Sequence, residues 1–144
     1  MRLCVRFLGL APDYCFQMTE NDVARVVVGG AFRVHSTLGP GLLESVYQAA
    51  LSLEVARSGL RQACQIPVPV VYGDITLGLG FRADILVEEK VVIEIKSVET
   101  TLPVNKKQLL TYLRLMDKRL GLLINFNVAL IKNGILRVVN GLED

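Results

Sequence analysis

The sequence predicts a single α/β domain in which helices pack on a mixed β-sheet. Two observations favour this fold class. Apolar residues recur at helical spacing in the first 60 residues and again after residue 103, whereas the segment between them alternates apolar and polar residues as strands do. Helices that precede and follow a group of strands are typical of a layered α/β fold. The 144 residues, 51% of them hydrophobic, are enough to bury one core.

Composition excludes several classes of protein. The apolar content rules out wholesale disorder, and no apolar run reaches the ~18 residues that a membrane span requires. A net charge of +2 is too small to identify a partner, and the single histidine, His35, argues against a His-rich zinc centre. The odd number of cysteines fits neither a metal motif nor a disulfide framework. We therefore expect a cytoplasmic protein with no membrane partner.

The N-terminal residues 1–17 differ from the rest of the chain. Their apolar stretch follows two arginines but is too short for a signal peptide, and no convincing cleavage site follows it. Thr19 or Asn21 can cap a helix that begins here. We interpret residues 1–17 as a disordered or mis-assigned extension, with Met18 as the biological start, and residues 18–144 as a single domain.

Two helices are predicted before the first strand. Residues 22–38 and 42–58 both carry apolar side chains at helical spacing, and Gly59 provides the C-terminal stop of the second. Gly39-Pro40-Gly41 separates them, because Pro40 cannot continue the hydrogen-bond ladder of a helix.

Residues 64–72 predict a strand at an edge of the sheet. Pro67 and Pro69 are two residues apart, so both missing N–H groups lie on one side of the strand. Gly73-Asp74 then forms a turn into a short strand at 75–77.

Two alternating strands follow, at 81–87 and 91–98. Residues 88–90 join them, and the length of this loop decides the register. If all three residues form the loop, Asp84 falls opposite Glu94 on the same face. A two-residue loop would instead pair Asp84 with Ile93 and separate the two carboxylates.

The C-terminal third predicts a helix at about 104–118 and a strand at 122–126. Asn133-Gly134 then predicts a hairpin turn. The order of elements is therefore two helices, four strands, a helix and two strands, which corresponds to an α/β sandwich with a mixed sheet.

Asp84, Glu94 and Lys96 are the first candidates for chemistry. Two carboxylates on adjacent strands can hold Mg²⁺, which prefers oxygen ligands, and the bound ion can polarise a phosphoryl oxygen. Lys96 projects from the same face as Glu94, within reach of a water or a scissile phosphate. The alternative is that these charges form the solvated face of an amphipathic hairpin.

Three polar residues on the helices are further candidates. Glu44 lies in the first turn of the second helix, where it either adds a third acidic group or simply favours the helix N-terminus electrostatically. Gln108 and Tyr112 share one face of the 104–118 helix and either bind substrate or edge the core. His35 is expected to pack against a neighbouring helix or to cap one.

Residues 104–119 carry five basic residues and one aspartate, a net charge of +4. The basic residues are Lys106, Lys107, Arg114, Lys118 and Arg119. Such a run is either a solvated helix face or a patch that follows phosphates.

Several separated motifs carry a family resemblance. The segment HSTLGPGLLESVY contains Gly41, Glu44 and Tyr47 in the pattern of the GxxExxY protein family. Further matching segments follow in the same order: FRAD from Phe81, IEIKSVE from Ile93, QLLTYL from Gln108 and GLLINF from Gly121. The chain resembles this family over roughly residues 20–142, and the family is similar to the PD-(D/E)XK nuclease superfamily.

This resemblance implies a restriction-endonuclease-like three-layer core, with a mixed β-sheet flanked by helices. It also implies that Asp84 and Glu94 bind Mg²⁺, with Mn²⁺ as an alternative, that Lys96 is the catalytic lysine and that Glu44 is the helix acid. Gln108 and Tyr112 resemble the Gln-x-x-x-Tyr motif of exonuclease-like members. The chain departs from the family at Asn105, where a histidine is frequent, and at Lys107, where a small residue is frequent.

We therefore expect a metal-dependent nuclease that cleaves DNA or RNA. Its catalytic residues would be Glu44, Asp84, Glu94 and Lys96, and its substrate-binding residues Lys106, Lys107, Gln108, Tyr112 and Arg114. One alternative is a nucleic-acid-binding module without turnover, because a shared fold does not establish activity. The other is a protein–protein adaptor, with a homodimer formed through the apolar strands at 122–139.

Overall fold

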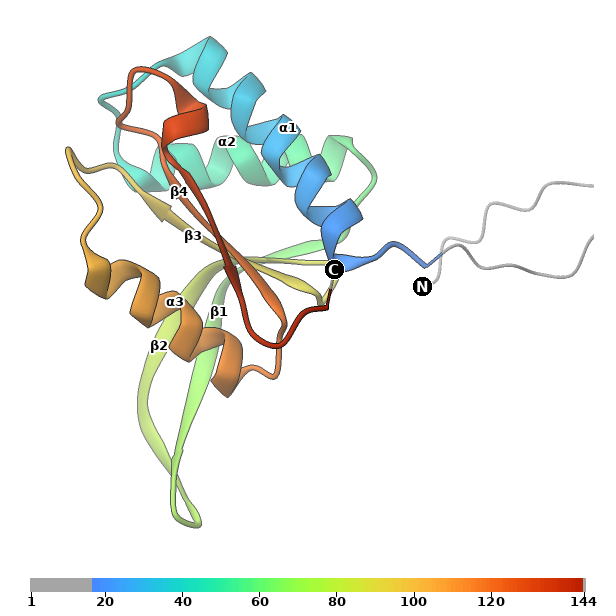
Figure 1. The fold of residues 1–144 in the computed structure, drawn as a ribbon, viewed down its shortest axis with the longest axis vertical. Helices are drawn as coiled ribbons and strands as arrows, with labels where there is room; N and C mark the ends of the chain where they lie inside the picture. The colour runs from blue at the N-terminus through green and yellow to red at the C-terminus, as the bar shows by residue number, and fades with distance from the viewer. Residues whose placement is uncertain (1–16, 144) are drawn as a thin grey trace, which may run out of the picture.

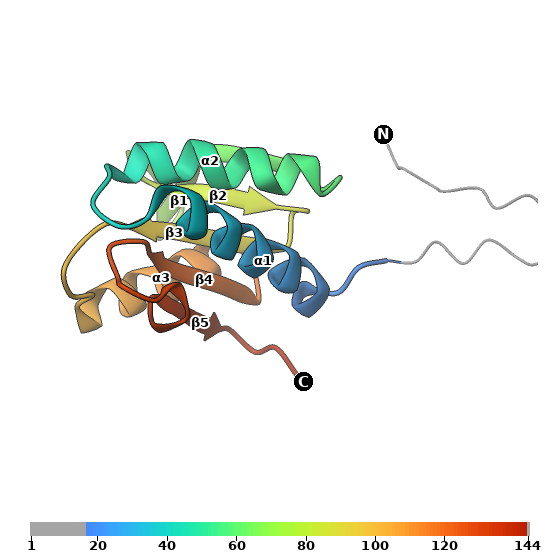
Figure 2. The same cartoon turned by 90° about the horizontal axis from the view of Figure 1, so that it is seen from above.

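A computed structural model describes residues 17–143 as one sheet with helices on both faces (Figure 1 and Figure 2). The elements, in chain order, are α1 (Glu20–Leu38), α2 (Glu44–Arg57), β1 (Gln62–Tyr72), β2 (Ile75–Val87), β3 (Val91–Lys96), α3 (Pro103–Leu115), β4 (Leu120–Asn125), the short 3₁₀ helix η1 (Ile131–Asn133) and β5 (Ile135–Val139). Apart from Gln17, the predicted extension at residues 1–17 lies outside the described residues.

The sheet has five strands in the order β1-β2-β3-β4-β5. β3 and β4 pair in parallel and are joined through α3, whereas the other neighbours pair antiparallel. The sheet is therefore mixed, as predicted. β1, which contains both prolines, occupies an edge of the sheet as predicted.

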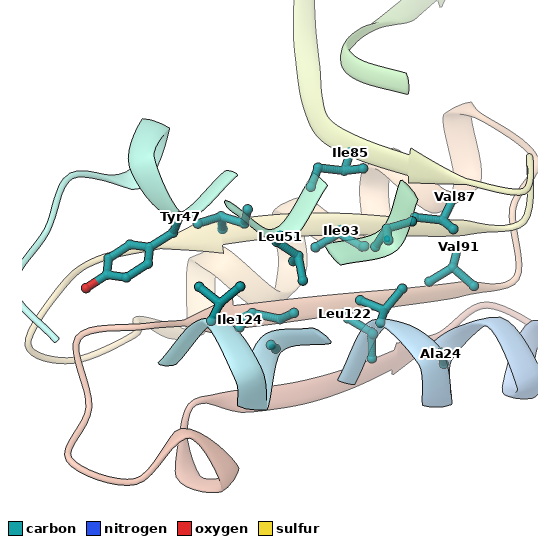
Figure 3. Packing of buried hydrophobic residues seen from close by; sticks show 14 of the residues in the cluster. Ala24, Tyr47, Leu51, Ile85, Val87, Val91, Ile93, Leu122 and Ile124 are labelled. Atoms are coloured by element: carbon teal, nitrogen blue, oxygen red, sulfur yellow. The ribbon is translucent and has the colours of Figure 1, made fainter. Parts of the chain in front are cut away.

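The strand alternation divides the core into two layers. Odd-numbered residues of β3, such as Ile93, pack with α1 and α2, where Tyr47 and Leu51 are fully buried (Figure 3). The even-numbered Val92 packs with Leu109 of α3 on the opposite face. The molecule is thus a three-layer α/β fold, and the face of β3 that carries Glu94 and Lys96 is the face that α3 covers.

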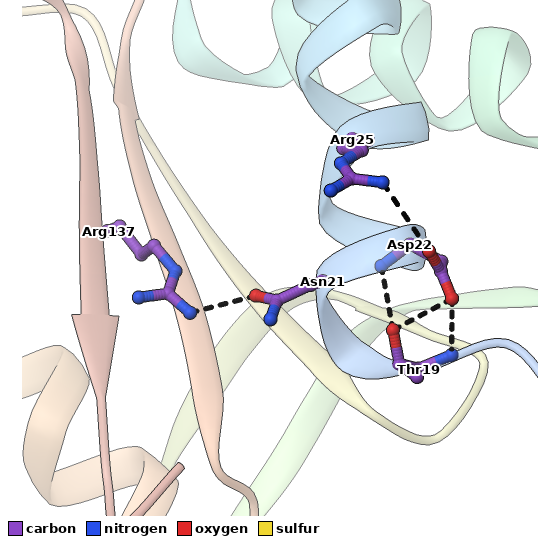
Figure 4. Close-up of polar contacts among 5 residues, drawn as sticks. All are labelled: Thr19, Asn21, Asp22, Arg25 and Arg137. Carbon is purple, nitrogen blue, oxygen red and sulfur yellow. Dashed lines mark hydrogen bonds and ion pairs between the residues drawn. The ribbon is translucent and has the colours of Figure 1, made fainter. Parts of the chain in front are cut away.

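Helix α1 begins at a capping box formed by Thr19 and Asp22 (Figure 4). The Thr19 hydroxyl accepts a hydrogen bond from the Asp22 N–H at 3.2 Å, and the Asp22 carboxylate accepts one from the Thr19 N–H at 2.9 Å. Arg137 of β5 donates to the Asn21 side chain at 2.8 Å, which ties α1 to the far edge of the sheet. The predicted cap at Thr19 is confirmed.

The loop between β2 and β3 has the three-residue form. Val87 pairs with Val91, and this register continues to Ile85 and Ile93, directly before Asp84 and Glu94. Glu88 and Glu89 both adopt positive φ, at 52° and 55°, so this tight turn is made by residues that rarely take the left-handed conformation.

Three sequence expectations about strands are wrong. Residues 75–77 and 81–87 form the single strand β2, because pairing with β1 continues on both sides of the glycines, with a shift of register between Leu77 and Phe81. The alternation along β2 also slips, so that Ala83 packs in the same layer as Leu86. Asn133-Gly134 makes no two-residue hairpin turn: Asn133 ends η1, and Gly134 has φ −96°, whereas such turns need positive φ.

None of the helices within residues 17–143 combines the length and the apolar character that crossing a membrane requires.

Candidate active site

Asp84 lies where β2 and β3 separate. The last pair between the two strands is Ile85 with Ile93, and two residues further along β3 the Ile95 N–H donates to Asp84 Oδ2 at 2.7 Å. A side-chain carboxylate thus takes the place of a backbone acceptor. Burial raises the pKa of Asp84, and the hydrogen bond from Ile95 opposes that rise.

Glu94 is the most deeply buried charged residue of the site, with 7% of its surface exposed. Its Oε1 is buried without a hydrogen-bond partner among the described residues. Burial, followed by the negative charge of Asp84, raises the pKa of Glu94 to about 8, and the positive charge of Lys96 opposes this only in part. An unpaired acceptor of this kind is costly unless something else satisfies it.

Lys96 follows Glu94 by two residues and therefore projects from the same face of β3. Its charge lowers the pKa of both Asp84 and Glu94. Within residues 17–143 Lys96 makes no ion pair shorter than 4.0 Å. Its ammonium is therefore available to bind a group other than Asp84 and Glu94.

Glu44 is the first residue of α2 and faces the end of β3. The Ser97 N–H donates to Glu44 Oε1 at 3.3 Å, and the Ser97 hydroxyl donates to the Leu42 carbonyl. Glu44 also raises the pKa of Asp84 and Glu94 through its negative charge. The helix acid and the two strand carboxylates therefore belong to one electrostatic group.

Tyr47 holds the segment that leads into Glu44. Its hydroxyl donates to the Gly39 carbonyl at 2.5 Å and accepts from the Leu42 N–H at 3.1 Å, and its ring stacks on Phe126 at a centroid distance of 4.5 Å. Gly41 has φ 98°, a conformation that favours glycine. The Gly41, Glu44 and Tyr47 pattern thus has a structural explanation: two residues shape the loop that presents the third.

A pocket of about 560 Å³ opens beside Asp84. Its lining residues are Leu42, Leu43, Glu44, Ser45, Gln48, Gln65, Asp84 and Ser97. Sequence reasoning missed Gln48 and Gln65. Gln48 lies one helical turn after Glu44, a spacing that could have indicated it. Nothing in the sequence pattern indicates Gln65.

Gln108 and Tyr112 lie on α3 as predicted, and Gln108 Nε2 donates to the Tyr112 hydroxyl at 2.8 Å. Tyr112 is buried and lies near the carboxylates, since burial and then the charge of Glu94 raise the pKa of its hydroxyl. Phe81 of β2 packs against the Tyr112 ring at 5.5 Å and is half exposed. Gln108 and Tyr112 therefore form the wall of the site on the α3 side.

The structure does not place the three predicted cationic residues of α3 on that wall. Lys106, Lys107 and Arg114 are exposed, and at about 100° per residue each lies more than roughly 100° around the helix from the Gln108–Tyr112 face. His35 lies outside the site as well, and its Nε2 lies 2.8 Å from the Val128 carbonyl oxygen. This contact is with the loop after β4, and the helix-packing or capping role expected of His35 stays a prediction.

The donor set fits a divalent cation in part. Among the described residues, no three His, Cys, Asp or Glu side chains lie close enough together to hold an ion. Two carboxylates do meet, however, and one of them keeps a buried oxygen with no partner. Hard cations such as Mg²⁺ are often held by one or two carboxylates together with water and substrate phosphate, and two is the number of carboxylates that meet here.

A three-layer α/β fold that brings two carboxylates and a lysine together on adjoining strands defines a restriction-endonuclease-like protein. A family model of the PD-(D/E)XK nuclease superfamily matches residues 21–138, and the chain belongs to that superfamily. The fold class predicted from the sequence is thereby confirmed. The narrower resemblance to GxxExxY proteins stays a prediction.

One solved structure, the crystal structure of SSO0001, is similar to the chain at 19% sequence identity with a TM-score of 0.46. The similarity covers 88% of this chain and 68% of that one. No curated protein matches the chain.

Proposed function

We propose that the chain is a metal-dependent nuclease that hydrolyses phosphodiester bonds in DNA or RNA. The observation that carries this proposal is the buried, unpartnered Oε1 of Glu94 beside Asp84. A fold that only needed a filled interior would be more stable with an apolar or amide side chain at this position. Nucleases of this superfamily generally use divalent metals, which supports the same reading.

Asp84 and Glu94 are the residues that would hold Mg²⁺ or Mn²⁺. When bound, the ion would supply Lewis-acid polarisation of a phosphoryl oxygen and make a bound water easier to deprotonate. Glu94 has a pKa of about 8 in the metal-free protein, so it has to release its proton before it can act as a ligand at neutral pH.

The other residues of the site have distinct roles in this proposal. Lys96 stabilises the negative charge that develops on the phosphoryl oxygens, because its ammonium has no competing ion pair with any of residues 17–143. Glu44 accepts a hydrogen bond from a water at the mouth of the pocket. Gln108 and Tyr112 orient the substrate on the α3 side, and the exposed Lys106, Lys107 and Arg114 contact phosphates further from the cleavage point.

The test combines metal binding with cleavage. Mg²⁺ and Mn²⁺ are titrated calorimetrically into the wild type and Glu94→Ala, and single- and double-stranded DNA and RNA are incubated with each protein with and without EDTA. We expect saturable metal binding that Glu94→Ala abolishes, and cleavage that EDTA stops. Lys96→Ala should bind the metal but cleave at least about 100-fold more slowly.

Glu89→Gln is the matched control. It removes a carboxylate from the opposite end of the same strand pair, where the side chain is exposed, and should leave metal binding and cleavage unchanged. Cleavage by Glu94→Ala at the wild-type rate would contradict the proposed mechanism.

A nucleic-acid-binding module without turnover is the second candidate function. It is favoured by the exposed cations of α3, since Lys106, Lys107 and Arg114 make no ion pair within the described part of the chain. Binding that persists in EDTA, falls with salt and is unaffected by Glu94→Ala would support it. The cytoplasmic location and the homodimer through residues 122–139 stay predictions.

A further inference from the structure

We propose that Gln65, braced by Gln48, is a positioning residue that fixes the orientation of the Asp84 carboxylate. The catalytic meaning of this inference rests on the proposed nuclease function. The contacts among Gln65, Gln48 and Asp84 are independent of that proposed function.

The first observation is the backbone of Gln65. This residue has φ 53°, in the left-handed region, although it lies inside strand β1 and is not glycine. The neighbouring residues Cys64 and Ile66 pair with Ile85 and Ala83 of β2, but Gln65 is missing from the ladder. A non-glycine residue keeps such a conformation only where its surroundings stabilise it, and such positions cluster at functional sites.

The second observation is what the side chain of Gln65 gains from that conformation. Its Nε2 donates to Gln48 Oε1 at 2.7 Å and to Asp84 Oδ1 at 3.3 Å. Both partners are acceptors at these atoms, so the two N–H groups of one amide are both used. Gln48 belongs to α2, one turn after Glu44, and the amide pair therefore links α2 to the strand that carries Asp84.

The third observation is that both oxygens of Asp84 are then held. Oδ2 accepts from the Ile95 N–H at 2.7 Å, and Oδ1 accepts from Gln65. Each carboxylate oxygen has a second lone-pair direction, which stays available to a cation. Hydrogen bonds that orient a ligand in this way are usually worth a factor of about 10 to 100 in metal affinity.

Gln65→Gly tests the inference, because glycine accepts φ 53° without strain and removes only the side-chain contacts. Glu89→Gly is the matched control: it also replaces a positive-φ residue, at φ 55°, but at the far end of β2. Gln48→Ala removes the oxygen that accepts from the Gln65 amide and leaves Gln65 itself unchanged. Each variant is compared with the wild type in two measurements, Mn²⁺ affinity by calorimetry and amide hydrogen exchange of the metal-free protein by NMR.

We expect Gln65→Gly to weaken Mn²⁺ binding about tenfold and to speed exchange of the Ile95 amide about tenfold, while the amides of β4 exchange as before. Gln48→Ala should act in the same direction to a smaller extent, and the double variant should resemble Gln65→Gly alone, because the two residues act through one contact. A purely structural role would instead change exchange throughout the sheet.

Unchanged Ile95 exchange in Gln65→Gly would overturn the inference, whatever happens to the metal. Equal effects in Gln65→Gly and Glu89→Gly would overturn it as well. Absence of Mn²⁺ binding in the wild type would count against the proposed function instead, and the Ile95 exchange would still decide whether Gln65 positions Asp84.

Discussion

Glu94 combines deep burial with an unmet hydrogen-bond acceptor, two properties that work against folding. Its pKa of about 8 means that the metal-free protein carries it protonated at neutral pH, because burial and the nearby Asp84 both disfavour the charge. Residues that raise the free energy of the folded state in this way are typical of sites where function, and not stability, dictates the side chain.

Glu94→Gln is expected to change how stability depends on pH. The pKa of an unfolded glutamate is about 4.3, so between that pH and about 8 the folded wild type holds a proton that the unfolded chain has lost. The stability of the wild type should therefore fall as pH rises through this window, by up to roughly 1.4 kcal/mol per pH unit. Glu94→Gln has no titrating carboxyl at this position, so its stability should not fall in this way. It should therefore be more stable than the wild type at pH 8.

Urea denaturation between pH 4 and pH 9 in EDTA measures this difference. Glu89→Gln, whose carboxylate is exposed, should follow the wild type at every pH. A wild type and Glu94→Gln variant whose stabilities stay parallel across the window would contradict the raised pKa.

At this scale the sequence indicated the candidate residues of the site more readily than the contacts that hold them. Loop length was enough to predict that Val87 pairs with Val91 and hence that Asp84 lies near Glu94, because this register follows from a local rule, although the alternation expected along β2 slips at Ala83. Gln65 could not be found, because its importance depends on a left-handed φ inside a strand, and strand propensity gives no sign of such a position.

At the scale of the elements, the connection between β4 and β5 supports the end of β3. The side chain of Asn125, the last residue of β4, accepts from the Val98 N–H at 3.1 Å and donates to the Val98 carbonyl at 2.8 Å. The Asn125 N–H in turn donates to the Gly134 carbonyl at 2.8 Å. This chain of contacts fixes the segment that leaves β3 directly after Lys96.

Gly134→Ala is expected to destabilise the protein by about 2 kcal/mol or more. A Cβ at this position would overlap the backbone oxygen of Asn125 and press on Val128, and a backbone atom cannot move aside as a flexible side chain can. Chemical denaturation measures the effect. Gly78→Ala is the control, because a Cβ there meets nothing within 4 Å and should cost little.

The Asn133-Gly134 pair illustrates why element boundaries were harder to predict than element types. The dipeptide is the usual signal of a tight hairpin, yet here the glycine is needed for close packing against Asn125. The helices, by contrast, were located to within a few residues, since their ends are marked by local signals such as the Thr19 cap and Gly59.

At the scale of the whole molecule, the exposed cations of α3 lie apart from the carboxylates of the candidate site. Glu44 and Asp84 line the pocket beside α2, and Glu94 lies on the face of β3 that α3 covers, whereas the exposed cations of α3 lie around the helix from the Gln108–Tyr112 wall. A nucleic acid that reaches Asp84 would therefore contact these cations only along a longer stretch of its backbone. Affinity and cleavage should depend on different residues.

Replacing Lys106, Lys107 and Arg114 together by alanine should weaken nucleic-acid binding and lower its salt dependence. Each lost phosphate contact reduces the slope of log K against log salt by about 0.7 to 0.9, depending on whether the nucleic acid is single- or double-stranded. Fluorescence anisotropy with a labelled oligonucleotide between 50 and 300 mM salt measures the slope.

Arg25→Ala is the control for that series, because Arg25 is exposed on α1, in the layer on the opposite face of the sheet. It should leave the slope unchanged. A triple variant with the wild-type slope would show that α3 does not contact phosphate.

The odd- and even-numbered residues of β3 lie on opposite faces of the sheet and have two different tasks. The odd positions, Ile93 and Ile95 among them, fill the larger core, whereas on the other face Val92 packs against α3 and Glu94 and Lys96 belong to the candidate site. The two tasks can therefore change independently as sequences diverge. A descendant of this chain could lose both charged residues and still fold, which would provide a simple route from the proposed nuclease to an inactive relative of the same fold.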